Sequence, residues 1–202
     1  MINTIIFDFG DVFINLKKET SIEEFKKLGL DGPNEDLLAH NDLFEKGKIS
    51  ESEFIKSFLK HIPNASMEEI LKAWNSLIGD FPLNRLEFLQ LLSSKYRLFL
   101  LTNTDSIHIN CFEHNVGMSF YTDFYNCFEK VYYSYEMGMR KPDPQIFNTI
   151  IRKHDLSPKR TLFVDDKKEN TEIAESLGLH IWNLKVGQED VIDLFEQKHL
   201  PL

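Results

Sequence analysis

The chain has 202 residues, of which 42% are apolar and 27% charged, proportions typical of a folded globular protein rather than a disordered or fibrous one. Its 23 basic and 32 acidic residues give a net charge of −9, and an acidic surface repels nucleic acid and anionic membranes. The longest apolar runs, such as 98–101, are far shorter than the roughly 20 residues that cross a bilayer. We therefore expect no nucleic-acid partner and no membrane association.

The cysteine content and the N-terminal sequence both indicate a cytoplasmic protein. The two cysteines, Cys111 and Cys127, are too few for a disulfide framework in a chain of this length, and free thiols are typical of a reducing compartment. The first residues carry no basic segment, and Asp8 and Asp11 interrupt the apolar stretch, so we expect no secretory signal there.

The first predicted element is a buried strand over 4–7, because a short apolar, β-branched run precedes a turn that begins at Asp8. Similar runs follow over 97–101, 131–133, 161–164 and 179–184. Helical patterns separate most of them, over 83–94, 106–116, 144–154 and 168–177. Strands that alternate with helices of this length indicate a parallel sheet covered on both faces. The predicted fold class is therefore α/β, with a three-layer, Rossmann-like core built on a parallel sheet.

Residues 17–81 interrupt this alternation, since they contain four short helical patterns and no convincing strand. Two of these helices have clear start signals, which are Ser50 with Glu53 and Ser66 with Glu69. In such a capping box each side chain accepts a hydrogen bond from the backbone N–H of the other residue. The segment is therefore predicted to be entirely helical.

This insertion divides the chain into two predicted domains. Residues 1–16 and 82–202 form the α/β core, and residues 17–81 form an all-helical cap. Because the insertion follows the first strand, we expect the cap to lie over the carboxyl ends of the strands. A cap in that position excludes water from a site and selects the substrate.

Polar side chains with a common chemistry follow several of the predicted strands. They are Asp8 after the first strand, Thr102 after the second, Lys141 beyond the third, and Asp165 with Asp166 after the fourth. Ligands of parallel sheets bind at these carboxyl ends, and three carboxylates brought together there repel one another. A Mg²⁺ ion removes that repulsion, since it prefers carboxylate, water and phosphate oxygens. With the lysine, such a site is neutral before substrate binds and accepts a phosphate dianion.

In chain order, these segments resemble the four motifs of the haloacid dehalogenase-like (HAD) hydrolase superfamily. The matching segments are Ile5-Ile6-Phe7-Asp8-Phe9-Gly10-Asp11-Val12, Leu100-Leu101-Thr102-Asn103, Lys141-Pro142 and Phe163-Val164-Asp165-Asp166, with Asn170 further on. One motif alone is a weak signal, whereas four in order at strand ends are a specific one. The segments 8–12 and 138–142 look most like a subgroup that includes sugar-phosphate phosphatases of the α-D-glucose-1-phosphatase type.

The resemblance implies a nucleophile and a metal site. Asp8 is implied to be the nucleophile, which forms an aspartyl-phosphate, while its other carboxylate oxygen binds Mg²⁺. The backbone carbonyl of Gly10 and the carboxylate of Asp166 are implied as further ligands. Asp165 is implied to bind the metal or to orient its waters, and Asn170 to support these groups from behind.

The resemblance also implies how the phosphate is held. Thr102 and the backbone N–H of Asn103 are implied to bind the phosphoryl oxygens, and Lys141 to stabilise the charge on the nucleophile and the transferring group. The implied function is Mg²⁺-dependent hydrolysis of a small phosphorylated metabolite, such as a sugar phosphate. The protein is expected to act as a monomer or a homodimer.

One departure from the pattern concerns proton transfer. Phosphatases of the superfamily usually carry an aspartate two residues after the nucleophile, and here Gly10 occupies that position. Without a general acid the rate falls by about 10²–10⁴. Asp11 is one candidate replacement that would contact the substrate, although adjacent side chains normally point to opposite sides. The favoured explanation is a substrate with a good leaving group, such as an anomeric hydroxyl. A weak or inactive relative is the third explanation.

Two alternative functions follow from the same residues. A haloacid dehalogenase would use Asp8 to displace halide without a metal, but it would gain nothing from the adjacent carboxylates of Asp165 and Asp166. A non-catalytic protein that binds phosphate on this scaffold is suggested by Gly10 alone. For His108 and Trp74, both near the predicted site, we expect packing roles rather than contact with a ligand.

Overall fold

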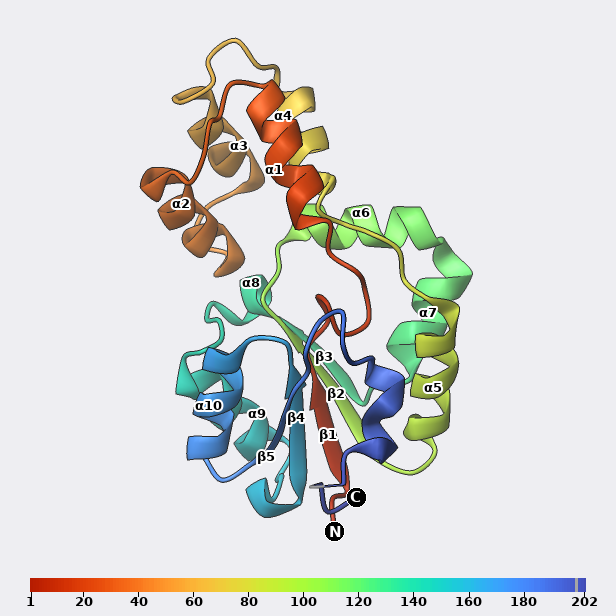
Figure 1. Cartoon of the computed structure of the whole chain (residues 1–202). Helices are drawn as coiled ribbons and strands as arrows, with labels where there is room; N and C mark the ends of the chain where they lie inside the picture. The colour runs from red at the N-terminus through yellow and green to blue at the C-terminus, as the bar shows by residue number, and fades with distance from the viewer. Residues whose placement is uncertain (199) are drawn as a thin grey trace.

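The computed structural model describes residues 1–198 and 200–202, and it contains a five-stranded parallel sheet (Figure 1). The strands are β1 (Thr4–Phe7), β2 (Arg97–Thr102), β3 (Lys130–Tyr133), β4 (Thr161–Asp165) and β5 (His180–Asn183). Their order across the sheet is β3-β2-β1-β4-β5. All five coincide with predicted strands to within a residue or two, so the predicted α/β class with a parallel sheet is confirmed.

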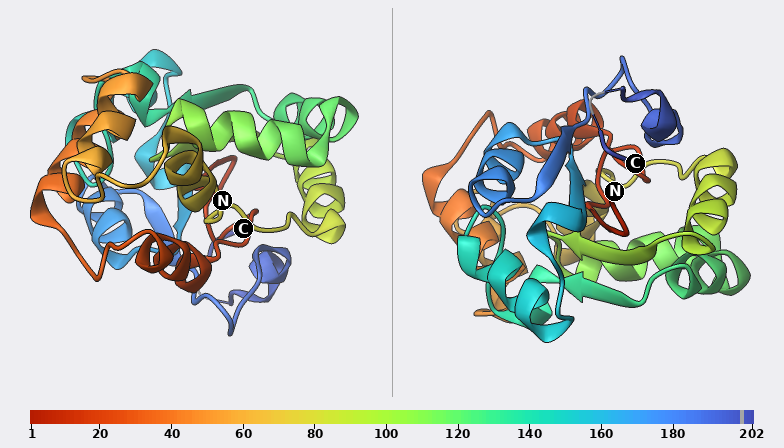
Figure 2. Two further views of the ribbon diagram at one scale, coloured as in Figure 1. Left: turned by 90° about the horizontal axis from the view of Figure 1, so that it is seen from above. Right: turned by 90° about the horizontal axis from the view of Figure 1, so that it is seen from below.

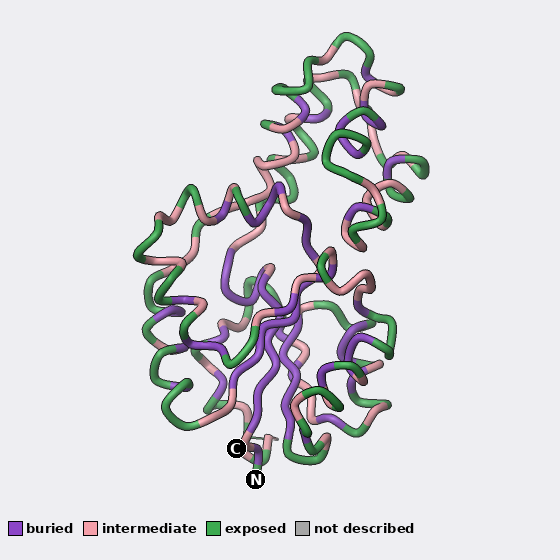
Figure 3. Tube along the Cα trace, turned by 180° about the vertical axis from the view of Figure 1, so that it is seen from behind, coloured by how far each residue is buried: buried purple, intermediate pink, exposed green. Residues whose placement is uncertain are grey.

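Helices cover both faces of the sheet because the side chains of each buried strand alternate between the two faces. Ile5 and Phe7 pack into one apolar cluster, and Ile6 packs into the other. The first cluster lies under α5 (Leu83–Ser93), α6 (Ser106–Val116), α7 (Met118–Asn126) and η2 (Val191–Glu196). The second lies under α9 (Pro144–Lys153) and α10 (Lys168–Ser176). Viewed along the strands the three layers separate clearly (Figure 2), and the strands are the most continuously buried part of the chain (Figure 3).

Four short elements were not predicted from the sequence, namely α7, α8 (Ser134–Met137), η1 (Pro158–Arg160) and η2. The α7 segment is rich in aromatic and β-branched residues, which are mediocre helix formers. Its helix is held by packing instead, since the fully buried Phe124 contacts Phe9 and Phe13 at centroid distances of 5.4 and 5.6 Å. Tertiary contacts thus override the local preference of this segment.

Four helices rise above the carboxyl ends of the strands (Figure 1). They are α1 (Lys18–Lys27), α2 (Glu35–Glu45), α3 (Glu51–Leu59) and α4 (Met67–Asn75). Both predicted capping boxes are present, at the starts of α3 and α4. These helices share an apolar cluster of their own, to which the rest of the chain adds Ile107 of α6 among its buried members. This separate cluster supports the division into a core and a cap, whose exact boundaries stay a prediction.

The two segments that join these four helices to the sheet run side by side. Gly79 N–H donates to Asn15 O at 2.9 Å, and Lys17 N–H donates to Leu77 O at 2.8 Å. A side chain at position 79 would not fit, because its Cβ would lie 2.3 Å from Asn15 O. Gly79 therefore allows the outgoing and returning segments to pair as one short antiparallel ribbon. Over the described residues, no helix is long and apolar enough to cross a membrane.

Replacing Gly79 with alanine should destabilise the protein, because the added Cβ forces the two paired segments apart. We expect the free energy of unfolding to fall by about 1–3 kcal/mol, measured by urea denaturation followed by circular dichroism. An unchanged denaturation midpoint would show that the ribbon tolerates separation.

Candidate active site

The predicted site residues meet where the order of the strands reverses. The chain proceeds outward from β1 through β2 to β3 and then returns to β4 on the other side of β1. Phe7 of β1 is in register with Val164 of β4, and the next N–H, that of Asp8, donates to Val164 O at 2.9 Å. Asp8 and Asp165 therefore leave two adjacent strands at the same level. In open parallel sheets this switch point is the usual position of a ligand site.

Three carboxylates form the acidic part of the site. One oxygen from each of Asp8, Asp165 and Asp166 lies within 4.8 Å of the others. Ligands of an octahedral Mg²⁺ lie at about 2.1 Å from the ion, so opposite ligands are about 4.2 Å apart. The three oxygens therefore need only small adjustments to contact one ion, and hard oxygen donors suit Mg²⁺.

The three carboxylates differ in how they are already bonded. Asp165 is fully buried, and it accepts hydrogen bonds from Asn170 Nδ2 at 3.0 Å and from Lys167 N at 2.8 Å. Asp8 and Asp166 line a cavity, whereas Asp165 does not. This arrangement favours Asp8 and Asp166 as direct metal ligands. Asp165 instead orients the side chains that are hydrogen-bonded to it. Asn170, which is 2% exposed, bonds to Asp165 and also lines the cavity, and its supporting role stays a prediction.

Lys141 is the central cation of the site. Its Nζ lies 2.8 Å from Asp8 Oδ1 and 2.6 Å from Asp165 Oδ2, and the residue is only 1% exposed. The side chain of Asn103 fixes its backbone, since Oδ1 accepts from Lys141 N at 2.9 Å and Nδ2 donates to Lys141 O at 2.8 Å. The Asn103 side chain thus positions the lysine, a contact that the sequence analysis did not anticipate. Thr102 ends β2, and both it and Asn103 line the cavity.

Burial controls the protonation of these groups. The pKa of Asp8 is raised to about 7, chiefly by removal from water and also by the neighbouring Asp165, while Lys141 acts in the opposite direction. The pKa of Asp166 is also raised, by burial and by Asp165. For Lys141, the attraction of Asp165 and Asp8 outweighs burial, so its pKa is raised and it stays charged. When ionised, the three carboxylates carry more negative charge than the buried Lys141 neutralises, and a divalent cation would relieve the excess.

The structure separates Gly10 from Asp11. Gly10 lines the cavity, and a Cβ at this position would lie 3.0 Å from Leu16 Cδ1, so Leu16 takes up the space that a longer side chain would need. Asp11 is not among the lining residues; it accepts a hydrogen bond from Leu16 N at 2.9 Å and pairs with Lys18. Asp11 therefore supports Lys18, which does face the cavity.

Helices α1, α2 and α4 and the segment after α4 supply the other wall of the cavity, whose volume is about 250 Å³. Most of the residues that complete the site were not predicted from the sequence. Among them are Lys18, Asn41, Glu45, Leu77, Ile78 and, from the sheet side, Lys167. Lys167 follows the two aspartates directly, so its position was available as a signal. Asn41 and Glu45 share a helix face at a spacing of four residues, but nothing in that spacing indicates which way the face points.

Trp74 and His108 both pack together and line the cavity. Their rings stack at 4.7 Å with an interplanar angle of 10°. His108 Nδ1 lies 3.0 Å from Asp105 Oδ2, and Nε2 lies 3.0 Å from Trp74 O. Burial lowers the pKa of His108, but the attraction of Asp105 outweighs it and the pKa is raised. With both ring nitrogens occupied, His108 is a wall of the cavity rather than a proton donor.

Known proteins resemble this chain over nearly its whole length. The model of the haloacid dehalogenase-like hydrolase family matches residues 2–178. A curated D-ribitol-5-phosphate phosphatase of Bacteroides thetaiotaomicron is 30% identical over 195 residues, which cover 94% of this chain and 95% of that protein.

Solved structures agree with the sequence relatives. A HAD family enzyme of Bacteroides thetaiotaomicron in complex with magnesium superposes with a TM-score of 0.87 at 36% identity, covering 97% of this chain and 99% of that chain. An aspartate-to-alanine variant of the enzyme, in complex with magnesium and inorganic phosphate, gives a TM-score of 0.85 at 35% identity, over 96% and 99% of the two chains. None of these relatives singles out the α-D-glucose-1-phosphatase type, which stays a prediction.

Replacing Lys141 with methionine should leave Asp8 and Asp165 buried without their counter-charge. We expect a loss of about 3–5 kcal/mol in the free energy of unfolding, measured by urea denaturation in the presence of EDTA. The matched control is Lys167→Met, which removes an exposed lysine from the same site and should cost less than about 0.5 kcal/mol. Equal effects of the two variants would contradict the central role of the buried ion pairs.

Binding of Mg²⁺ should depend on pH, because the ion and a proton compete for Asp8. Since the pKa of Asp8 is about 7, we expect affinity to fall about tenfold per pH unit below that value. Isothermal titration calorimetry near pH 8 and near pH 5.5 measures this. The Asp8→Asn variant should bind Mg²⁺ more weakly and with a flatter pH dependence. The same dissociation constant at both pH values in the unchanged protein would refute the competition.

Proposed function

Because the chain belongs to the haloacid dehalogenase-like hydrolase family, we propose that it is a Mg²⁺-dependent phosphatase of small phosphorylated metabolites. The observation that carries this proposal is the position of Asp8. Its carboxylate contacts the cation of Lys141 and lies beside the carboxylates of Asp165 and Asp166, at one end of a cavity. A nucleophile, a countercharge and a set of metal ligands are thus assembled at one point.

Asp8 is the proposed nucleophile. Lys141 holds its Oδ1 at 2.8 Å, which fixes the carboxylate so that an oxygen faces the phosphorus. Attack forms the bond from Asp8 to phosphorus and breaks the ester bond, and the departing oxygen then takes up a proton. Water subsequently cleaves the aspartyl-phosphate and releases inorganic phosphate, which regenerates Asp8. Thr102 and the N–H of Asn103 are placed to bind the phosphoryl oxygens.

The residues present fit a Mg²⁺ ion held by Asp8, Asp166 and the carbonyl of Gly10, with Asp165 and Asn170 in support. When bound, the ion would neutralise charge on the phosphoryl group during transfer. Lys18 and Lys167 add positive charge to the cavity. In a protein of net charge −9, this local group of cations would attract an anionic ester to the cavity.

The size of the cavity favours a small substrate. A volume of about 250 Å³ lies below the roughly 300–1,000 Å³ of pockets that enclose drug-sized ligands. Ribitol 5-phosphate, named for a relative at 30% identity, is an ester of suitable size. Gly10 offers no acid and Asp11 is paired with Lys18, so a sugar 1-phosphate, whose anomeric leaving group needs less protonation than the primary hydroxyl of ribitol 5-phosphate, also suits the site.

Metal-dependent release of phosphate tests the proposal. Purified protein is incubated with sugar phosphates, ribitol 5-phosphate and p-nitrophenyl phosphate, with Mg²⁺ or with EDTA. We expect release with Mg²⁺ only, and a loss of about 10³-fold or more in Asp8→Asn.

Two outcomes would contradict the phosphatase proposal. Release that is unaffected by Asp8→Asn would point to a contaminating enzyme. If no ester releases phosphate and 2-chloropropionate releases chloride without a metal, the protein is a dehalogenase, whose nucleophile would be the same aspartate.

A further inference from the structure

Helix α2 contributes hydrogen-bond acceptors to the cavity, not cations. Asn41 and Glu45 both line it, and neither has a part in the proposed binding of phosphate or Mg²⁺. A carboxylate repels a phosphate dianion, so Glu45 suits the uncharged end of a substrate. The cavity therefore has an anion-binding end at the sheet and an acceptor-rich wall at α2.

Both residues carry a buried oxygen without a hydrogen-bond partner among the described residues. The two atoms are Asn41 Oδ1 and Glu45 Oε2. Asn41 Nδ2 donates to Glu45 Oε1 at 3.3 Å, so the donor of the amide is used while its acceptor is not. Buried acceptors are normally satisfied, and an unsatisfied one calls for a specific explanation. Both oxygens are almost inaccessible to solvent, so a small rotation of the two side chains toward the cavity would let the O–H donors of a ligand reach them.

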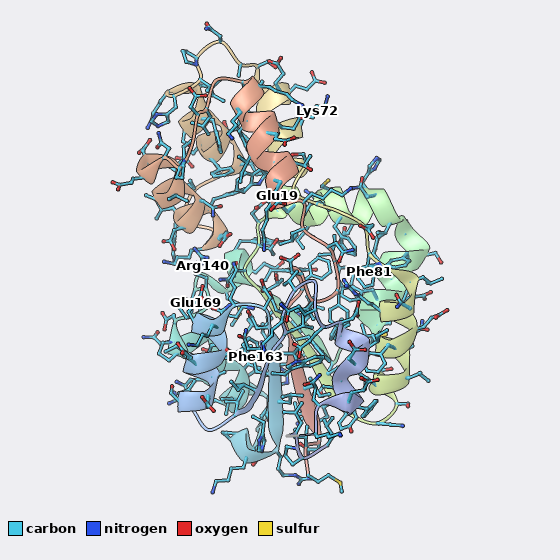
Figure 4. All side chains as sticks on the ribbon, viewed as in Figure 1. Glu19, Lys72, Phe81, Arg140, Phe163 and Glu169 are labelled. Atoms are coloured by element: carbon cyan, nitrogen blue, oxygen red, sulfur yellow. The ribbon has the colours of Figure 1, made fainter. Side chains whose placement is uncertain are left out.

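The core holds this pair in place through Arg140. Arg140 Nη2 lies 3.0 Å from Glu45 Oε2, close enough for an ion pair although not aligned for a hydrogen bond. Arg140 Nη1 lies 3.2 Å from Asp42 Oδ1 on the same helix. Figure 4 labels Arg140 between the lower end of α2 and the sheet, and the next residue in the chain is Lys141. The α2 wall is therefore fixed relative to the nucleophile.

The remaining surface of this part of the cavity suits a carbon chain. Leu77 and Ile78 line it, and Trp74 presents an aromatic ring. A polyhydroxylated chain has C–H groups, which pack on such a surface, and O–H groups, which donate hydrogen bonds to acceptors such as the oxygens of Asn41 and Glu45. A purely apolar leaving group would leave the oxygens of α2 unsatisfied, and a second anion would meet Glu45.

We propose that Asn41 and Glu45 are specificity-determining residues, which accept hydrogen bonds from the hydroxyl groups of a polyol or sugar phosphate. This inference rests on the proposed phosphatase function and names the chemical class of its leaving group.

The test compares kcat/KM for three esters with Mg²⁺ present. Ribitol 5-phosphate carries hydroxyl groups, n-pentyl phosphate has the same length without them, and p-nitrophenyl phosphate has a good leaving group. We expect Asn41→Ala and Glu45→Ala to lose about 10- to 100-fold on ribitol 5-phosphate, and to change little on the other two. The matched control is Glu35→Ala, which removes an exposed carboxylate of α2 from outside the cavity and should leave all three values nearly unchanged.

The three esters separate the possible outcomes. Equal losses on ribitol 5-phosphate and n-pentyl phosphate, with p-nitrophenyl phosphate spared, would overturn the inference and make Glu45 a proton donor. Equal losses on all three esters would assign Asn41 and Glu45 a structural role instead. Wild-type protein that hydrolyses p-nitrophenyl phosphate without preferring ribitol 5-phosphate to n-pentyl phosphate would refute the inference alone. Wild-type protein that releases no phosphate from any ester would refute the proposed function, and the inference with it.

Discussion

The ion pairs of one buried lysine organise the site. Lys141 Nζ contacts Asp8 at 2.8 Å and Asp165 at 2.6 Å, and all three residues are buried. Burying charges costs free energy that their attraction repays only when the geometry is good, and here the amide of Asn103 fixes the lysine backbone on both sides. One further carboxylate, that of Asp166, lies close by. The local excess of negative charge is what makes a divalent cation a natural component of this site.

The loop that carries Lys141 also connects the candidate active site to the helices above it. Arg140 precedes Lys141 and pairs with two acidic residues of α2. Close to this contact, the turn that follows α2 passes so near to the core that a Cβ at Gly47 would lie 2.2 Å from Tyr135 O, and Gly47 has a φ of +62°. Only glycine adopts that conformation at so little cost in so little space. The wall that faces the nucleophile is therefore held by backbone approach as well as by charge.

Much of the site could be predicted because its residues follow strands. A polar residue directly after a buried parallel strand lies at the carboxyl edge of the sheet whatever the rest of the fold does, so Asp8, Thr102 and Asp165 were assigned to one edge from sequence alone. The residues that were missed come from helices. An amphipathic pattern on α2 shows that Asn41 and Glu45 share a face, but the direction of that face depends on how α2 packs against the core. Helix α7 was missed for a related reason, since packing of Phe124 stabilises a segment of modest helix propensity.

The sequence by itself determined the alternation of strands and helices, the start signals of α3 and α4, and the motifs of the haloacid dehalogenase-like hydrolase family. These features depend on contacts between residues close in the chain, or on side-chain patterns that repeat with the period of a strand or helix. The tertiary structure alone decided that Leu16 fills the space beside Gly10, that Asp11 pairs with Lys18, and that the acceptors of α2 line the cavity. Such contacts join segments whose relative placement is set by the packing of the whole domain, and no local pattern encodes it.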